Sequence, residues 1–161
     1  TGGFMGGALC VNEDNEDIDV VSCRVINNTA PNGGAMCFDI GNHKITLSRS
    51  LFLSNRALGT VGGVEIGISN TEIEVSECEF LRNIATGNTG GLRFFHGNGY
   101  FSVRRCIFRD NIATSSGGGL TISERNFDCD IVDNIFERNA VYGGGRGGAI
   151  VITRQNDNVR I

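Results

Sequence analysis

Apolar and polar residues alternate over short segments of this chain. Residues 92–94, 100–104 and 120–122 show the two-residue period of a strand with one buried face. No stretch has the 3.6-residue period of an amphipathic helix, and frequent glycines would break one. The pattern predicts short strands joined by turns.

Two sequence markers recur with one common period. Gly-Gly pairs followed by an apolar residue begin at Gly6, Gly33, Gly62, Gly90, Gly118 and Gly147, and their successive differences in residue number are 27, 29, 28, 28 and 29. An asparagine recurs at Asn28, Asn55, Asn83, Asn111 and Asn139, where the differences are 27, 28, 28 and 28. Two independent markers in one register establish an internal repeat.

Apolar residues keep the same register and form columns. Three residues before each asparagine come Val25, Phe52, Phe80, Phe108 and Phe136. Two residues after it come Ala30, Ala57, Ala85, Ala113 and Val141. Two further columns are Ile18, Ile45, Ile73, Phe101, Cys129 and Val20, Leu47, Val75, Val103, Ile131. After the glycine pairs we expect two more apolar columns. They are Ala35, Val64, Leu92, Leu120, Ala149 and Cys37, Ile66, Phe94, Ile122, Val151.

A unit of this length cannot bury an apolar face alone, so successive units must stack. Three short strands per unit fit one turn of a parallel β-helix that rises roughly 4.8 Å per coil. We therefore predict an all-β fold, a right-handed single-stranded parallel β-helix of about five to six coils. Residues 1–161 would form a single domain.

The asparagine and glycine columns have structural explanations. Stacked asparagine side chains can hydrogen-bond to one another along the helix axis, and asparagine tolerates the left-handed conformation of a sharp corner. Glycine suits a corner that needs positive φ or close backbone approach. We expect no chemistry from either column.

Composition and charge exclude several classes of protein. The chain has 24 glycines without a Gly-X-Y period and is 40% hydrophobic, which excludes collagen and argues against disorder. The formal net charge of −4 gives no support for a nucleic-acid partner. No apolar run approaches 18 residues, so we expect no membrane insertion by this segment.

The six cysteines all occupy repeat positions that elsewhere hold core or corner residues. Small buried thiols commonly fill such positions. Cys10 and Cys37 would lie on adjacent coils, as would Cys78 and Cys106, so disulfides remain an alternative to free thiols. The absence of a Cys-x-x-Cys motif predicts no metal site, and we expect no cofactor.

Charged residues alternate in sign along outward columns. These columns are Arg49, Glu77, Arg105, Asp133; Arg82, Asp110, Arg138; Glu65, Arg93; and Arg109, Glu137. Opposite charges on neighbouring strands stabilise the stacking register. The predicted pairing leaves few strand carboxylates for catalysis. The acidic run at residues 13–17 and the two histidines, His43 and His96, are predicted to lie in solvated loops.

A catalytic alternative rests on one outward column. Asp19, Glu74 and Asp130 share it, with Thr46 and Ser102 between them. Carboxylates two coils apart would be about 9.6 Å from each other, at the edge of the spacing of inverting glycosidases. We expect no catalytic residues and no enzymatic activity.

The repeat motifs resemble those of the chlamydial polymorphic membrane proteins, surface adhesins of the autotransporter type. The Phe-x-x-Asn motif stands at residues 52–55, 80–83, 108–111 and 136–139. It alternates with Gly-Gly-Ala or Gly-Gly-Leu, except at residues 62–64, where the pair is followed by valine. The resemblance covers nearly the whole chain. It implies a right-handed β-helix at the cell surface or outside the cell, with a host receptor or glycan as partner.

The sequence thus predicts a non-catalytic extracellular module that acts in adhesion. The alternatives are a filament-forming structural subunit and a polysaccharide-active enzyme. Residues 1–5 align with the turn at 141–146, and residues 159–161 resemble the first strand of another coil. We therefore expect a piece of a longer solenoid or a fibre subunit that associates end to end. In a eukaryotic source, Asn27 would be a glycosylation site, because it begins an Asn-Asn-Thr sequon.

Overall fold

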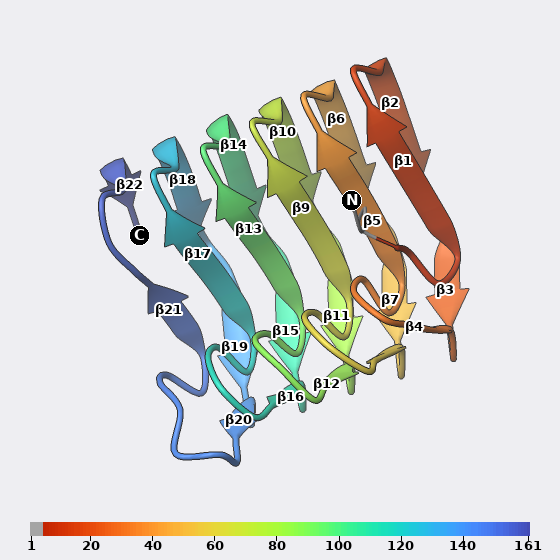
Figure 1. The fold of residues 1–161 in the computed structure, drawn as a ribbon, viewed down its shortest axis with the longest axis vertical. Helices are drawn as coiled ribbons and strands as arrows, with labels where there is room; N and C mark the ends of the chain where they lie inside the picture. The colour runs from red at the N-terminus through yellow and green to blue at the C-terminus, as the bar shows by residue number, and fades with distance from the viewer. Residues whose placement is uncertain (1–4) are drawn as a thin grey trace.

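The computed structural model describes residues 5–161, which form a stack of parallel coils (Figure 1). Every strand in this part of the chain pairs in parallel with the equivalent strand of a neighbouring coil, one repeat away, as in Ile45↔Ile73↔Phe101. Residues 5–161 contain no helix. The predicted all-β parallel solenoid is confirmed, with about five turns.

Two six-stranded sheets hold the longer strands. Sheet I consists of β1 (Leu9–Glu13), β5 (Met36–Ile40), β9 (Val64–Ile68), β13 (Leu92–His96), β17 (Leu120–Glu124) and β21 (Ile150–Ile152). Sheet II consists of β2 (Glu16–Val21), β6 (His43–Ser48), β10 (Thr71–Ser76), β14 (Gly99–Arg104), β18 (Phe127–Val132) and β22 (Asp157–Arg160).

Two five-stranded sheets complete each coil, which therefore has four strands where three were expected. Sheet III consists of β3 (Arg24–Ile26), β7 (Leu51–Leu53), β11 (Glu79–Leu81), β15 (Ile107–Arg109) and β19 (Ile135–Glu137). Sheet IV consists of β4 (Thr29–Ala30), β8 (Arg56–Ala57), β12 (Ile84–Ala85), β16 (Ile112–Ala113) and β20 (Ala140–Val141). The fourth strand is only two residues long, too short to show a period in the sequence.

The core is built from inward columns that follow the predicted register. Phe52, Phe80, Phe108 and Phe136 stack face to face, with neighbouring ring centroids 4.8–4.9 Å apart. The predicted alanine, isoleucine and valine columns of sheets II and IV also pair as expected. Because neighbouring parallel strands lie about 4.8 Å apart, aromatic rings at equivalent positions come close enough to stack on one another along the column.

The register predicted after the glycine pairs is wrong in two coils of sheet I. Met36, and not Ala35, pairs with Val64, and Ile150, and not Ala149, pairs with Leu120. Likewise Phe38 takes the position expected for Cys37, and Ile152 that expected for Val151.

Turn length explains this correction. The turn from sheet IV to sheet I has six residues at 58–63, 86–91 and 114–119, but five at 31–35 and eight at 142–149. Alanine and glycine replace each other at the tight corner, so the Gly-Gly pair is not a fixed marker of register. A Cβ on Gly34, for example, would collide with the carbonyl oxygen of Gly62.

The sharp corners use left-handed backbone, but not at the predicted asparagines. The residue before each ladder asparagine has the positive φ, between 48° and 58°: Asn27, Ser54, Arg82, Asp110 and Arg138. Among the repeated Gly-Gly pairs of residues 5–161, only Gly147 has a positive φ. Most of these positions therefore need glycine because the backbone of the next coil comes too close to leave room for a Cβ, and not because φ is positive.

Asparagine side chains do stack along the axis, as predicted. Each Oδ1 accepts bonds from the backbone N–H and the Nδ2 of the asparagine one coil earlier, as Asn83 does from Asn55 at 3.0 Å for each bond. A second ladder, which sequence inspection missed, lies between sheets I and II and contains Asn15, Asn42, Asn70, Asn98, Asn126 and Asn156. Buried amides are thereby satisfied in every coil.

Candidate functional site

Several charges in the predicted columns are paired between coils, but within residues 5–161 Arg49, Arg82 and Asp133 form no ion pair. Arg105 binds Glu77 at 3.1 Å, Arg138 binds Asp110 at 2.7 Å and Arg109 binds Glu137 at 2.6 Å. The first two pairs lie at corners and the third on sheet III, and all are substantially exposed. The hydrogen bond from Arg138 lowers the pKa of Asp110.

The carboxylate column proposed for catalysis lies on sheet II in the predicted register. Asp19 and Glu74 flank Thr46, and Ser102 separates Glu74 from Asp130. Asp130 binds two arginines, Arg160 at 2.7 Å and Arg104 at 2.8 Å. The hydrogen bond from Arg160 is the main cause of its lowered pKa. This aspartate is held as an anion in an ion pair.

Both histidines lie in strands, which corrects the predicted loop positions. His43 begins β6 and His96 ends β13. Each adjoins the second asparagine ladder, where strand pairing continues up to the corner. His43 Nδ1 lies 2.8 Å from Thr71 Oγ1, and His96 pairs in register with Glu124.

All six cysteines are free thiols. Cys37 pairs in register with Cys10, and the backbone N–H of Cys78 donates to Cys106 Sγ at 3.4 Å. Burial raises the pKa of Cys129 to about 12 and also raises that of Cys37. These two buried thiols therefore remain protonated and weakly nucleophilic at neutral pH.

The other candidates from the sequence lie near the first coil. The acidic residues at 13–17 span the end of β1 and the start of β2, where Lys44 binds Glu16 at 2.9 Å and Asp17 at 3.3 Å. Asn27 is exposed. Within residues 5–161, no three His, Cys, Asp or Glu side chains come together as metal ligands.

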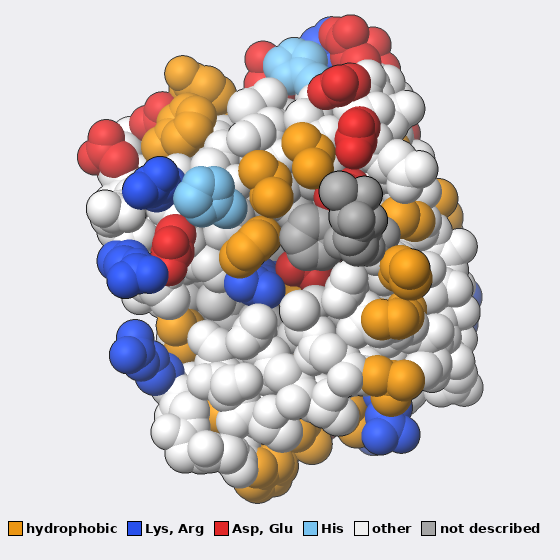
Figure 2. Space-filling view, in the orientation of Figure 1, with side chains coloured by type: hydrophobic (Ala, Val, Ile, Leu, Met, Phe, Trp, Pro, Cys, Tyr) orange, Lys and Arg blue, Asp and Glu red, His pale blue; other side chains and the backbone are white. Residues whose placement is uncertain are grey.

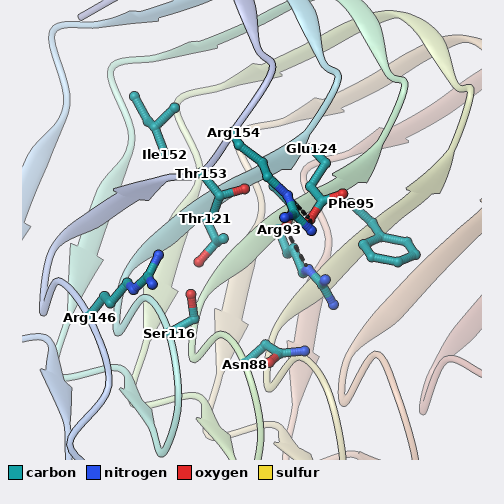
Figure 3. A pocket seen from close by; sticks show the side chains of 11 residues that line it. Asn88, Arg93, Phe95, Ser116, Thr121, Glu124, Arg146, Ile152, Thr153 and Arg154 are labelled. Carbon is teal, nitrogen blue, oxygen red and sulfur yellow. Dashed lines mark hydrogen bonds and ion pairs between the residues drawn. The ribbon is translucent and has the colours of Figure 1, made fainter.

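The outer face of sheet I carries a hollow of about 660 Å³ that was not predicted. Outward side chains of β13 and β17 form its floor, including Arg93, Phe95 and Thr121 (Figure 3). Ser123 of β17 also lines it. In this view of the molecule, basic side chains gather over the end that carries β21, and acidic ones over the end that carries β1 and β2 (Figure 2). The hollow belongs to the basic end.

A buried ion pair supports the floor. Glu65 is fully buried and binds Arg93 Nη1 at 3.3 Å, while Thr60 Oγ1 donates to its other oxygen at 2.6 Å. Arg93 Nε donates to Ser123 Oγ at 3.1 Å, and the guanidinium lies 4.2 Å from the ring centroid of Phe95. Burial raises the pKa of Glu65 and lowers that of Arg93. These contacts hold the guanidinium along the floor.

The walls of the hollow come from the turns and from the last coil. Asn88, Ser116 and Arg146 stand on three successive turns between sheets IV and I, and Figure 3 shows Arg146 and Ser116 extending toward the strands. Thr153 and Arg154 follow β21 at the opposite side. Arg154 is paired with Glu124, Nη2 to Oε1 at 2.8 Å.

Four wall side chains have no partner. Within residues 5–161, the side chains of Asn88, Ser116, Arg146 and Thr153 make no hydrogen bond or ion pair, and Thr153 Oγ1 is buried. Buried hydroxyls are nearly always hydrogen-bonded in proteins. The walls of the hollow therefore offer donors and acceptors that the fold itself does not use.

Sequence inspection missed the hollow because its wall lies in turns outside the repeat markers. One signal was present: the interval from Val141 to Ile150 is two residues longer than that from Ala113 to Leu120. The longer turn contains Gly-Gly-Gly followed by Arg146. An insertion in one repeat commonly marks a binding face in solenoids.

The chain matches no protein-family model, no curated protein and no solved structure. The resemblance to chlamydial surface repeats therefore rests on the motif residues alone. In the part of the chain that the structure describes, no helix has the length and apolar content to cross a bilayer.

Proposed function

We propose that this chain is a non-catalytic extracellular binding module that acts in adhesion and presents the outer face of sheet I to its ligand. The observation that carries the proposal is the hollow on that face, with four side chains that lack partners within residues 5–161. Binding sites are typically concave, with a few convergent polar groups on a rigid support.

The scaffold supports this role. Two asparagine ladders and stacked phenylalanines fix the position of each coil, so the floor strands β13 and β17 are rigidly placed. The resemblance to surface adhesins favours a location outside the cell. The tightly bound Asp130 and the fully buried Glu65 are poor candidates for general acid or base, which favours binding over catalysis.

Cell binding tests the proposal. Fluorescently labelled protein should bind cultured epithelial cells saturably in flow cytometry, and Arg146→Ala should weaken that binding. Arg105→Ala, which removes an arginine of the Arg105–Glu77 corner pair, should bind like the wild type. Absence of saturable binding, or release of new reducing ends from any polysaccharide in the assay, would contradict the proposal.

The filament alternative stays a prediction. End-to-end association would raise the sedimentation coefficient of the chain steadily with protein concentration. A constant coefficient over a hundredfold range of concentration would contradict it, and would leave the binding proposal untouched.

A further inference from the structure

We propose that the hollow on sheet I binds a carboxylated sugar and that Arg146 anchors its carboxylate. The inference rests on the proposed binding function and specifies its ligand. It follows from the size of the hollow, from the partners of each charged group, and from the hydroxyl and amide groups that remain without partners.

The size of the hollow suits a short oligosaccharide. Its volume of about 660 Å³ lies within the range of roughly 300–1,000 Å³ typical of small-ligand sites. Polar side chains dominate the lining, and the only apolar ones are Phe95 and Ile152. A mostly polar hollow of this kind favours a hydroxyl-rich ligand over an apolar one.

The charges around the hollow favour one carboxylate. Four charged side chains line it, three arginines and Glu124. Arg154 is bound to Glu124, and Arg93 is bound to Glu65 beneath the floor. Arg146 has no acidic partner among residues 5–161, so one cation remains unneutralised. A guanidinium binds a carboxylate through two parallel hydrogen bonds, which makes arginine selective for this group.

The remaining groups suit sugar hydroxyls. Asn88, Ser116 and Thr153 each combine a donor with an acceptor, which is what a hydroxyl-rich ligand needs. Thr153 Oγ1 is buried without a partner within residues 5–161, and a rotation of this side chain would be needed to bring the hydroxyl to a ligand in the hollow. Nucleic acid is a poorer candidate, because it requires several unpaired cations along a backbone and the chain carries a net charge of −4.

Binding is measured by calorimetry with two matched pairs of probes. The first pair is sialyllactose and lactose. The second is a trisaccharide of galacturonic acid and the same trisaccharide after reduction of its carboxyl groups. At least one acidic probe should bind about tenfold or more tightly than its neutral partner, as expected for a charge-assisted bidentate contact.

Variants locate the site. Arg146→Ala should weaken binding of that probe about tenfold or more, and Arg146→Lys should restore it only in part, because an ammonium cannot form the bidentate contact. Thr153→Val, which keeps the shape of the side chain, should weaken binding about threefold or more. Arg105→Ala serves as the matched loss of one exposed arginine and should bind normally. Unchanged circular dichroism and melting temperature establish that each variant folds.

Three results would overturn the inference. The first is that each acidic probe binds with the same affinity as its neutral partner, and the second is that a sulfated lactose binds as tightly as the acidic probe. The third is that Arg146→Ala binds like Arg105→Ala. If no probe binds although the protein still binds cells, the sugar assignment fails and the proposed function stands. If cell binding is also absent, both fail.

Discussion

Sheet III and the hollow on sheet I satisfy their polar side chains in different ways. On the outer face of sheet III, Arg109 binds Glu137 one coil later, and at the adjoining corner Arg138 binds Asp110 one coil earlier. Around the hollow, Asn88 and Arg146 have no partner within residues 5–161. The two regions share the same coils, so the local register and not the fold class produces the difference.

Turn length explains one part of the contrast, the position of Arg146. Between sheets III and IV the corner residues recur at a constant spacing, so the ladder asparagines and the Asp110–Arg138 pair meet from one coil to the next. Between sheets IV and I the turn grows from six residues to eight in the last coil, and equivalent side chains no longer meet. The insertion therefore accounts for Arg146, which has no equivalent neighbour in the coil before it. Asn88 and Ser116 lie in turns of equal length, and there the side chains do not bond to their equivalents although the spacing is constant.

The largest expected effect removes the core that both regions share. Phe108→Ala deletes a fully buried ring stacked between Phe80 and Phe136, and should cost about 3–5 kcal/mol in the free energy of unfolding measured in urea. Ile135→Ala, at an outward position on neighbouring β19 that is 48% exposed, is the control and should cost far less. Similar costs for the two variants would show that the inward and outward positions are misassigned.

Asparagines in the two regions should respond differently to the same substitution. Asn83→Ala leaves the backbone N–H of Asn55 without its acceptor, at about 1–3 kcal/mol for a buried group left unbonded, and removes one of the two bonds of the Asn55 Nδ2, which keeps its bond to the Val25 carbonyl. Asn88→Ala removes a side chain that has no partner among residues 5–161, and should change stability by less than about 0.5 kcal/mol. Ligand binding per folded molecule should survive the first substitution and weaken in the second; the reverse pattern would refute the structural assignment of the ladder.

Glu65 should make stability depend on pH in a specific direction. Burial raises its pKa in the folded protein above the ordinary 4.5. Between pH 4.5 and the folded-state pKa, the folded state therefore binds more protons than the unfolded state. Wild-type stability should therefore fall relative to Glu65→Gln as the pH rises from 4.5 through the folded-state pKa. Asp110 and Asp130 are present in both proteins, so their lowered pKa values cancel in the difference. Urea unfolding between pH 4 and pH 8 measures the difference in unfolding free energy between the wild type and Glu65→Gln. A difference that stays constant or rises with pH would show that the effect of Arg93 on the pKa of Glu65 outweighs the effect of burial.

A single hydrogen bond distinguishes two threonines near the hollow. Thr60→Val removes the 2.6 Å bond to Glu65 and should cost about 1–3 kcal/mol. Thr153→Val removes a buried hydroxyl without a partner and should leave stability unchanged or slightly higher. Thermal denaturation of both variants tests this, and a clear loss in Thr153→Val would reveal a partner for that hydroxyl.

The sequence predicts those features whose residues recur with the repeat period. The phenylalanine, alanine and first asparagine columns, with much of the charge pairing, follow from residues repeated at constant spacing. The ladder through Asn42, Asn70, Asn98 and Asn126 keeps the same spacing and was predictable from it. The register at Ala35 was not, because alanine and glycine fill the same tight corner. The hollow was not, because its wall lies in turns whose length varies and whose side chains meet only in three dimensions.

Chemical-shift mapping tests most directly whether the side chains without partners form the binding site. The tighter of the two acidic probes is titrated into isotopically labelled protein, and backbone amides and arginine Nε–H groups are followed by NMR. We expect the largest shifts at Arg146, at the glycines of residues 143–148 and in β17, with the sheet III residues near Arg109 unchanged. Shifts concentrated on sheet II or sheet III, with Arg146 unaffected, would contradict the assignment of the hollow as the binding site.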